Sequence, residues 1–367
     1  MVLRHSRHAM LAIAINLFTG FSSARGGASE APPSHPFETR AAVSQISVLS
    51  YNIKGMPWPA AWGRDAAMDR IAARLAAYRR QGTQPDIVLL QEAFTDTARE
   101  IGRRAGYRHV VFGPDAGQVP TGEDTEPLGR DWVHGEAIGK SVGSGLAILS
   151  DFPILSVATV AYGDHACAGF DCLANKGAMM AMIRVPGQRE PVRVFNTHLN
   201  ARTASGVAVS KANLAFRRQL GLFARFVRRE ETGSSAPVII GGDFNIGKDE
   251  ERRAAFSALS TTGSVPGYVA LDRASGALLV HRNAIAGGRH GADMRAIVRR
   301  RKDLMFASPS LRPVRASVPF GTEASGPALS DHFGYRIDYA LRSEPGRRAV
   351  RVAASDLSDA AMRSFRR

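Results

Sequence analysis

Five segments of the sequence place acidic, amide or imidazole side chains beside an apolar run. In chain order they are "LSYNI" with Asn52, "VLLQEAF" with Glu92, "VFNTHLN" with His198 and Asn200, "IIGGDFN" with Asp243 and Asn245, and "LSDHFGY" with Asp331 and His332. A single polar residue at such a position is commonly a cap or a turn residue. Five such segments from most of the chain predict a shared pocket at one edge of a sheet, where ligands bind in many α/β folds.

The side-chain types in this set fit metal-assisted hydrolysis of a phosphate ester. Mg²⁺ prefers oxygen ligands and keeps several waters, so Glu92 and Asn52 together with a substrate phosphate are enough to bind it; Mn²⁺ and Ca²⁺ are the alternatives. Histidine exchanges protons near neutral pH, and Asp and Asn orient water or donate hydrogen bonds to a charged phosphate. Covalent catalysis fits poorly, because no GxSxG nucleophile elbow follows one of the apolar runs and the cysteines lie apart from these segments.

Short apolar runs predict the strands that position these residues: "ISVLSYNI", "DIVLLQEAF", "GLAILS", "MMAMIRV", "VRVFNTHL" and "VIIGGDFN". Apolar residues recur at helical spacing in residues 66–80 and 211–229. This mixture predicts a layered α/β domain with buried sheet and outer helices. Residues 262–302 are rich in Gly and Arg with weak periodicity, so we expect loops there.

The composition describes a folded, basic chain. It has 367 residues, 44% of them hydrophobic, which is enough for one large domain or two ordinary ones. The formal net charge of +15 favours an anionic partner, such as nucleic acid, an acidic membrane surface or a phosphorylated small molecule. Charge indicates the sign of the partner and leaves its identity open.

The two ends of the chain differ in composition from the middle. Arg4 and Arg7 precede an apolar stretch and then small residues up to Ala24, which predicts a secretory signal peptide over residues 1–24; a buried or amphipathic helix is the alternative. Residues 25–45 are interpreted as a linker and residues 342–367 as a basic tail. We therefore expect a secreted or periplasmic protein, and a monomer.

The sequence contains two cysteines, Cys167 and Cys172. In an exported protein such a close pair can form a small disulfide, and two free thiols or part of a metal site are the alternatives. A metal site is disfavoured because two further Cys or His ligands are lacking nearby, although His165 adjoins.

The ordered motifs resemble the endonuclease/exonuclease/phosphatase superfamily, which includes deoxyribonuclease I, apurinic endonucleases, inositol-polyphosphate phosphatases and sphingomyelinases. They are "SYNIKG", "LLQEAF", "SGLAILSDFPI", "NTHLNA", "GGDFNIG", "KDLMFA" and "SDHFGY", within residues 46–341, which we interpret as the catalytic domain. One motif alone could arise by chance, whereas the ordered series is specific. The resemblance implies a four-layer α/β/β/α sandwich, with two mixed β-sheets packed face to face and helices outside.

The resemblance also implies roles for the polar residues. Glu92 resembles the principal metal-binding carboxylate, and Asn52 the asparagine that helps to bind metal or phosphate. His198 resembles the histidine that acts as acid beside the leaving oxygen or holds the phosphate. Asp243 resembles the residue that orients the attacking water, and Asn245 the one that stabilises the charged phosphate.

Asp331 and His332 resemble the terminal Asp-His pair of the superfamily, with His332 as general base or phosphate-binding imidazolium. The resemblance implies a carboxylate partner for His332, and the candidates are Asp303 in "KDLMFA" and Asp338 in "YRIDYAL". Asp303 is preferred because it precedes the Asp-His pair, as the order of motifs requires. Lys302 stands where the motif usually has an apolar residue.

The segment "DCLANKGAMMAMIRV" is similar to the corresponding part of sphingomyelinases, which implies a lipid head-group phosphodiesterase. Asn200 and Lys176 are then candidate substrate contacts; for Lys176, a solvated lysine at a strand start is the alternative. A zwitterionic or anionic phosphate ester at a membrane surface is the expected partner. Met56, Trp58 and Trp62 follow Asn52 and are suited to dip into that surface, although they could instead pack on the sheet. The exposed late aromatic hairpin of secreted sphingomyelinases is not found in the sequence.

A secreted nuclease like deoxyribonuclease I is the competing interpretation. The basic charge, including Arg299 to Arg301 and the tail, suits binding of a phosphate backbone. A non-enzymatic toxin-like or receptor-binding module with a decayed site is a third class. The complete set of acid, amide and imidazole groups argues against decay.

Overall fold

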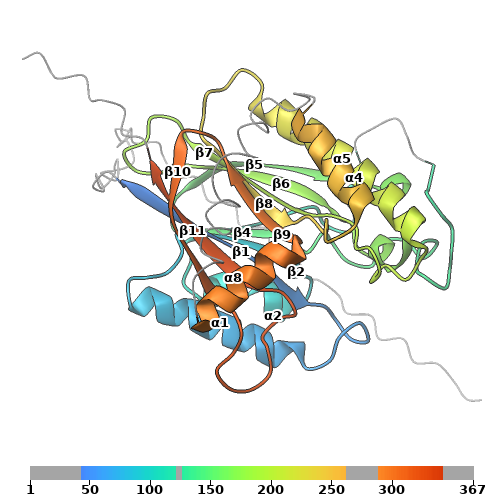
Figure 1. Ribbon diagram of the computed structural model, residues 1–367, viewed down its shortest axis with the longest axis horizontal. Helices are drawn as coiled ribbons and strands as arrows, with labels where there is room; N and C mark the ends of the chain where they lie inside the picture. The colour runs from blue at the N-terminus through green and yellow to red at the C-terminus, as the bar shows by residue number, and fades with distance from the viewer. Residues whose placement is uncertain (1–42, 121–125, 262–287, 342–367) are drawn as a thin grey trace, which may run out of the picture. The chain divides into compact units, whose positions relative to one another are not determined.

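The computed structural model describes residues 43–120, 126–261 and 288–341 (Figure 1). The expected signal peptide, the basic tail and nearly all of the linker lie outside these residues. Among the described helices, none has the length and apolar character needed to cross a bilayer.

Two β-sheets form the centre of the fold. In spatial order, the six-stranded sheet contains β10 (Leu311–Phe320), β11 (Gly334–Leu341), β1 (Gln45–Gly55), β2 (Ile87–Ala93), β4 (Ala147–Ser150) and β3 (His109–Phe112). The five-stranded sheet contains β5 (Ile154–Ala161), β6 (Gly177–Ile183), β7 (Val192–His198), β8 (Val238–Asp243) and β9 (Asp303–Ala307). Both sheets are mixed, because β1 with β2 and β7 with β8 are parallel pairs among antiparallel neighbours.

Helices cover the outer faces of the two sheets (Figure 1). The outer face of the six-stranded sheet packs against α1 (Arg64–Arg80), α2 (Asp96–Arg99) and α3 (Ile101–Arg104). The outer face of the five-stranded sheet packs against α4 (Val209–Glu231) and α5 (Glu250–Thr261). A further helix, α8 (Gly288–Arg300), contacts β10. The expected four-layer α/β/β/α sandwich is therefore confirmed.

The strand sequences explain this layering through side-chain alternation. In β1, Ile46 and Val48 pack in the core between the sheets, whereas Leu49 and Tyr51 pack in the core under α1. Successive strand residues point to opposite faces, so a strand with apolar residues on both faces is buried on both sides. This is why the central strands read as continuous apolar runs.

The two glycines that precede Asp243 have separate steric reasons. A Cβ atom on Gly241 would lie 2.5 Å from Cδ1 of Leu89, which belongs to the facing sheet. Gly242 has φ of 142°, and a Cβ atom there would lie 2.1 Å from the carbonyl oxygen of Thr197 on β7. A side chain on Gly241 would push the two sheets apart, and one on Gly242 would push β8 away from β7, so both glycines are needed to position Asp243.

The expectation of loops over residues 262–302 is wrong for its last part, where α8 forms. The helix buries Met294 and Ile297 and exposes arginines on its other faces, so its apolar stripe is too narrow to stand out in the sequence. Residues 262–287 lie outside the described part of the chain. The structure also contains the short strand β3 and the partly exposed strands β5 and β10, which the apolar runs did not indicate.

Candidate active site

The polar residues singled out in the sequence meet at one edge of the stacked sheets. The parallel strands β1, β2, β7 and β8 end at this edge, and the antiparallel strands β9 and β11 begin there. In the five-stranded sheet, His198, Asp243 and Asp303 are direct register partners on three neighbouring strands. The facing sheet contributes Asn52 and Glu92.

Asn52 joins the two sheets at this edge. Its amide nitrogen donates to Oε1 of Glu92 at 2.8 Å and to Oδ2 of Asp243 at 3.1 Å. Its amide oxygen accepts from the backbone N–H of Lys54 at 3.1 Å. In this orientation the amide oxygen is directed away from the carboxylates, and Asn52 holds Glu92 and Asp243 side by side.

Glu92 reaches the site only because its backbone is left-handed. Val88 and Leu90 pack under the outer helices, so strict alternation would send Glu92 to the same outer face. Its φ of 58° breaks the alternation, and Ala93 takes the outer position while Glu92 contacts Asn52. A non-glycine residue in this conformation costs roughly 1–3 kcal/mol and is found most often at functional sites.

Lys176 is a buried component of the site. Only 4% of the residue is exposed, so the alternative of a solvated lysine is wrong. Its ammonium group lies 3.0 Å from Oδ1 of Asp171, 3.1 Å from the carbonyl oxygen of Leu199 and 3.2 Å from Nε2 of His198. Because an ammonium group only donates, Nε2 of His198 accepts this hydrogen bond. Burial and the neighbouring Lys176 charge lower the pKa of His198 to about 3, so the imidazole is neutral.

A disulfide lies next to this lysine. Cys167 and Cys172 are bonded, which resolves the three alternatives left open by the sequence. Asp171, the partner of Lys176, immediately precedes Cys172 in a 3-10 helix (Gly169–Leu173), and its Oδ2 accepts from the backbone N–H of Ala201. The disulfide therefore constrains the loop that holds Lys176 against His198.

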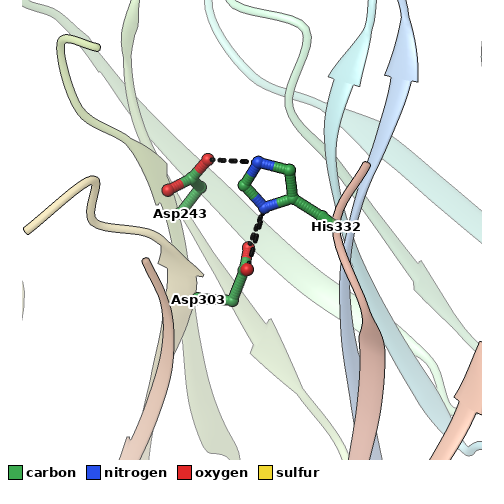
Figure 2. Close-up of side chains that lie close together, drawn as sticks. All are labelled: Asp243, Asp303 and His332. Carbon is green, nitrogen blue, oxygen red and sulfur yellow. Dashed lines mark hydrogen bonds and ion pairs between the residues drawn. The ribbon is translucent and has the colours of Figure 1, made fainter. Parts of the chain in front are cut away.

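His332 lies between two carboxylates (Figure 2). Its Nδ1 is 2.9 and 2.8 Å from the two oxygens of Asp303, and its Nε2 is 3.7 Å from Oδ2 of Asp243. Burial lowers the pKa of His332, but the charges of Asp303 and Asp243 outweigh burial and raise it to about 9. Burial also raises the pKa of Asp243, and the charges of His332 and His198 lower it to about 2. At neutral pH the site thus contains a protonated imidazole between the carboxyl groups of Asp243 and Asp303, and burial raises the pKa of Asp303.

Asp303 is the carboxylate partner of His332, as preferred from the order of the motifs. Asp338 lies within β11, and its Oδ1 accepts from Nε of Arg336 at 2.6 Å. Asp331 lies at the rim, where its side chain is 56% exposed and forms an ion pair with Lys54 at 3.2 Å.

Asn245 and Asn200 differ in what they can offer a substrate. Asn245 adopts φ of 50°, and its amide nitrogen donates to the carbonyl oxygen of Leu199 at 3.0 Å. Asn200 is fully buried; its amide oxygen accepts from the N–H of Ala168, and its amide nitrogen donates to the carbonyl oxygen of Ala201. Because both polar ends of Asn200 bond to the backbone, its position indicates a structural role instead of the expected substrate contact.

The donor set fits a divalent cation. One donor atom from each of Asp243, Asp303 and His332 lies within 4.8 Å of the others, a spacing that could hold a metal ion. However, a protonated imidazole cannot ligate a metal, and it already supplies positive charge between these aspartates. Glu92 is the better candidate for a metal ligand. Burial raises the pKa of its carboxyl group, and the neighbouring His198, whose Nε2 is 4.0 Å away, is neutral and supplies no positive charge. A cation beside Glu92 would supply the missing counter-charge.

Sequence reasoning missed a polar layer just beneath the site. Gln91 donates to Oδ1 of Asn196 at 2.8 Å across the two sheets, and Asn196 donates to the carbonyl oxygens of Leu90 and Ala147 at 2.9 and 3.0 Å. Hydrogen bonds between buried amides fix the relative position of packed elements. The sequence feature that could have indicated this layer is a polar residue inside each of the apolar runs "LLQEA" and "VFNTH".

Sequence reasoning also missed Arg252, the largest fully buried side chain in the described residues. Its guanidinium donates five hydrogen bonds, which is its full set of N–H donors. The acceptors are Oδ1 of Asn213 and the carbonyl oxygens of Asn200, Asn245, Ala201 and Ala212. Arg252 therefore connects α5 to α4 and to the loops that follow β7 and β8.

Several solved structures are similar to this chain. Sphingomyelinase C from Streptomyces griseocarneus is 21% identical, with 82% of this chain and 100% of that chain covered and a TM-score of 0.51. A form of beta toxin from Staphylococcus aureus is 19% identical, with 81% and 100% covered and a TM-score of 0.52. An endonuclease/exonuclease/phosphatase protein from Beutenbergia cavernae is 20% identical, with 82% and 72% covered and a TM-score of 0.53. At these identities the similarity shows the fold.

A sequence comparison with curated proteins gives no match. The model of the endonuclease/exonuclease/phosphatase family, in contrast, matches residues 49–361, which include every site residue described above. By this match and by its fold, the chain belongs to the endonuclease/exonuclease/phosphatase family and is a phosphoric ester hydrolase.

Proposed function

We propose that the protein is an exported, divalent-metal-dependent phosphodiesterase that hydrolyses the head-group phosphodiester of a membrane lipid, with water as the nucleophile. The observation that carries the proposal is the meeting of Glu92, His198, Asp243 and His332 around Asn52 at one sheet edge. These groups can bind a cation, orient a water molecule and stabilise negative charge on a phosphate.

The metal is proposed to bind at Glu92, with Asn52 holding the carboxylate in place. When bound, a divalent cation neutralises phosphate charge and polarises the phosphorus centre. We propose Mg²⁺, which Mn²⁺ or Ca²⁺ could replace; a structurally similar variant of beta toxin from Staphylococcus aureus contains bound magnesium ions. Oxygen donors at a partly open position suit this ion.

The protonation states suggest how the protein groups act. Asp243 is ionised, so it can accept a hydrogen bond from the attacking water and orient it. His332 is protonated at neutral pH, which favours the phosphate-binding imidazolium over the general base. His198 is neutral and is held in place through Lys176.

A membrane substrate is supported by exposed aromatic side chains. All three tryptophans of the chain are exposed: Trp58 by 68%, Trp62 by 79% and Trp132 by 70%. Trp58 and Trp62 lie on the loop that follows the site strand β1, and so do not pack on the sheet. Trp132 lies on a loop whose His134 contacts Phe170, the residue next to Asp171. Tryptophan favours membrane–water interfaces, so these loops are suited to hold the site at a bilayer.

A nuclease is the second candidate, because basic residues line a pocket beside Asn245. One assay separates the two candidates: purified protein with Mg²⁺ is incubated with sphingomyelin vesicles and, separately, with plasmid DNA. Release of phosphocholine with intact DNA is the expected result, and DNA cleavage with inert vesicles would reverse the ranking. Glu92→Gln should lower turnover by several orders of magnitude in whichever assay is active, and full activity of this variant would refute the site.

A further inference from the structure

A pocket of about 380 Å³ adjoins the active site at Asn245. Three segments form its walls: residues 201–204 after β7, residues 245–249 between β8 and α5, and a third segment with Arg300, the last residue of α8, and Lys302, which precedes β9. Of the candidate catalytic residues, only Asn245 lines it. The pocket is therefore a neighbouring compartment at the same sheet edge.

The lining of this pocket is strongly cationic. Arg202, Lys248, Arg300 and Lys302 contribute four positive charges, and Asp249 contributes one negative charge. That carboxylate is already paired: Oδ2 accepts from Nε of Arg202 at 2.8 Å, and Oδ1 accepts from the backbone N–H of Arg252 at 3.1 Å. Within the described residues, Lys248, Arg300 and Lys302 form no salt bridge. The pocket thus has an excess of three positive charges, which favours an anion and disfavours a quaternary ammonium group.

The pocket wall is held in place before any ligand binds. The buried guanidinium of Arg252 bonds the carbonyl oxygens of Ala201 and Asn245, which belong to two of the three segments. The third segment is tied to the second, because Gly247 N–H donates to the carbonyl oxygen of Arg301 at 3.1 Å and Phe244 N–H to that of Lys302 at 2.8 Å. A preformed cationic wall loses little conformational entropy when an anion binds.

The pocket and the catalytic centre are electrostatically connected. Lys302 precedes Asp303 in the chain. Burial raises the pKa of Asp243, but the charges of His332 and His198, and with a smaller effect that of Lys302, together outweigh burial and lower it. Arg300 lies over the ring of Phe333, the residue that follows His332, at 5.7 Å. The pocket is therefore close enough to receive a group that neighbours a scissile phosphorus bound near Asp243 and His332, because Asn245 lines the pocket and its backbone N–H donates to Asp243.

We propose that this pocket is a second phosphate-binding subsite, filled by another phosphate group that the substrate carries next to its scissile diester. The inference rests on the proposed diester hydrolysis at the adjoining centre and narrows its substrate class. The preferred substrate has two phosphate groups, whether they come from a lipid head group with two phosphates or from successive nucleotides. A zwitterionic phosphocholine diester would fill the catalytic centre and leave this subsite without a matching charge.

Binding measurements test the subsite apart from catalysis. Calorimetry with thymidine 3′,5′-bisphosphate and thymidine 5′-phosphate should show about tenfold tighter binding of the bisphosphate, the gain expected from one charge-assisted contact. Lys248→Glu should abolish this preference, and Lys248→Arg should keep it. Arg108→Glu is the matched control, because it makes the same change in charge and Arg108 is exposed and precedes β3 at the opposite sheet edge. Equal binding of both nucleotides, or a preference that survives Lys248→Glu, would overturn the proposal.

Kinetics separate this proposal from the proposed function. The 5′-p-nitrophenyl esters of the same two nucleotides should both be hydrolysed, with a lower KM for the ester that carries the 3′-phosphate. If neither ester is hydrolysed, the diesterase assignment fails for soluble substrates, while calorimetry still decides the subsite. Vesicles of cardiolipin and of sphingomyelin, and a short oligodeoxynucleotide, then identify the source of the second phosphate. A Lys248-dependent preference for cardiolipin or for the oligonucleotide supports the subsite, and a preference for sphingomyelin that Lys248→Glu does not change overturns it.

Discussion

Both carboxylate oxygens of Asp303 lie within hydrogen-bond distance of Nδ1 of His332, at 2.9 and 2.8 Å. This contact fixes the imidazole so that Nε2 faces the carboxylate of Asp243. A histidine held between two buried aspartates is stabilised in its protonated form. The chemistry of the site therefore depends on a contact between residues on β9 and on the segment before β11.

The first prediction concerns the protonation of His332. In metal-free protein, its imidazole should titrate at about 9, above the value of about 6.5 in an unfolded chain. Its contribution to the free energy of unfolding should be complete below about pH 6.5 and should be lost as the pH rises through about 9. NMR titration of the His332 ring protons measures this value. In Asp303→Asn the value should fall toward 6.5, and an unchanged value would show that Asp303 does not hold the proton.

The second prediction concerns the disulfide and Asp171. Cys172→Ser or Asp171→Asn should lower turnover by roughly 10- to 100-fold, because small displacements of catalytic groups have effects of this size. The physical path is Asp171 to Lys176 at 3.0 Å and Lys176 to His198 at 3.2 Å. Turnover and thermal melting are measured together. Loss of activity at an unchanged melting temperature is expected for Asp171→Asn, whereas full activity in both variants would contradict the path.

The third prediction concerns Arg252. Replacement by Met keeps much of the volume but removes five hydrogen bonds to buried acceptors, which should reduce the free energy of unfolding by about 3 kcal/mol or more. Urea denaturation measures the change. Exposed Arg225 on the same side of the fold, in α4, is a suitable control, and Arg225→Met should change stability by less than about 0.5 kcal/mol. Similar losses in both variants would exclude a special role for Arg252.

The fourth prediction concerns the polar layer between the sheets. Asn196→Ala removes the hydrogen bond that Gln91 donates to Asn196 and the two that Asn196 donates to backbone carbonyl oxygens, which should reduce stability by about 2–3 kcal/mol. Asn196 lies two residues before His198 on β7. Activity should therefore fall as well, because the two sheets that carry the site residues lose their alignment. The double variant with Gln91→Leu and Asn196→Leu should regain part of the stability, since both polar groups are then removed. Equal stability of the single and double variants would show that the amide pair contributes no coupling.

The fifth prediction concerns the exposed tryptophans. Two variants test them: a double variant with Trp58→Ala and Trp62→Ala, and the single variant Trp132→Ala. Each should lower the ratio of vesicle hydrolysis to soluble-ester hydrolysis, because tryptophan side chains favour the membrane–water interface. Leu155→Ala is the control, because Leu155 is 48% exposed near the start of β5, at the opposite sheet edge. Vesicle sedimentation measures binding directly. A ratio that stays constant in all variants would remove the support for a membrane substrate.

Much of the central fold could be predicted from the sequence. The runs around Asn52, Glu92, His198 and Asp243 became β1, β2, β7 and β8, because apolar residues on both strand faces require burial on both sides. Helices α1 and α4 follow from apolar residues at helical spacing. By contrast, the edge strands β3, β5 and β10 are only partly buried, and α8 has many arginines and few apolar residues, so none of them forms an apolar run that could be recognised.

The sequence by itself determined which chemical groups are available and that they cluster at strand ends, since local propensity and apolar patterning are encoded in short segments. Only the tertiary structure decided which groups meet, and it shows the left-handed backbone of Glu92, the burial of Lys176 and the cationic pocket around Lys248. These features depend on contacts between residues that are far apart in the chain. Sheet register and the packing of two layers create those contacts, and neither is written in any single segment.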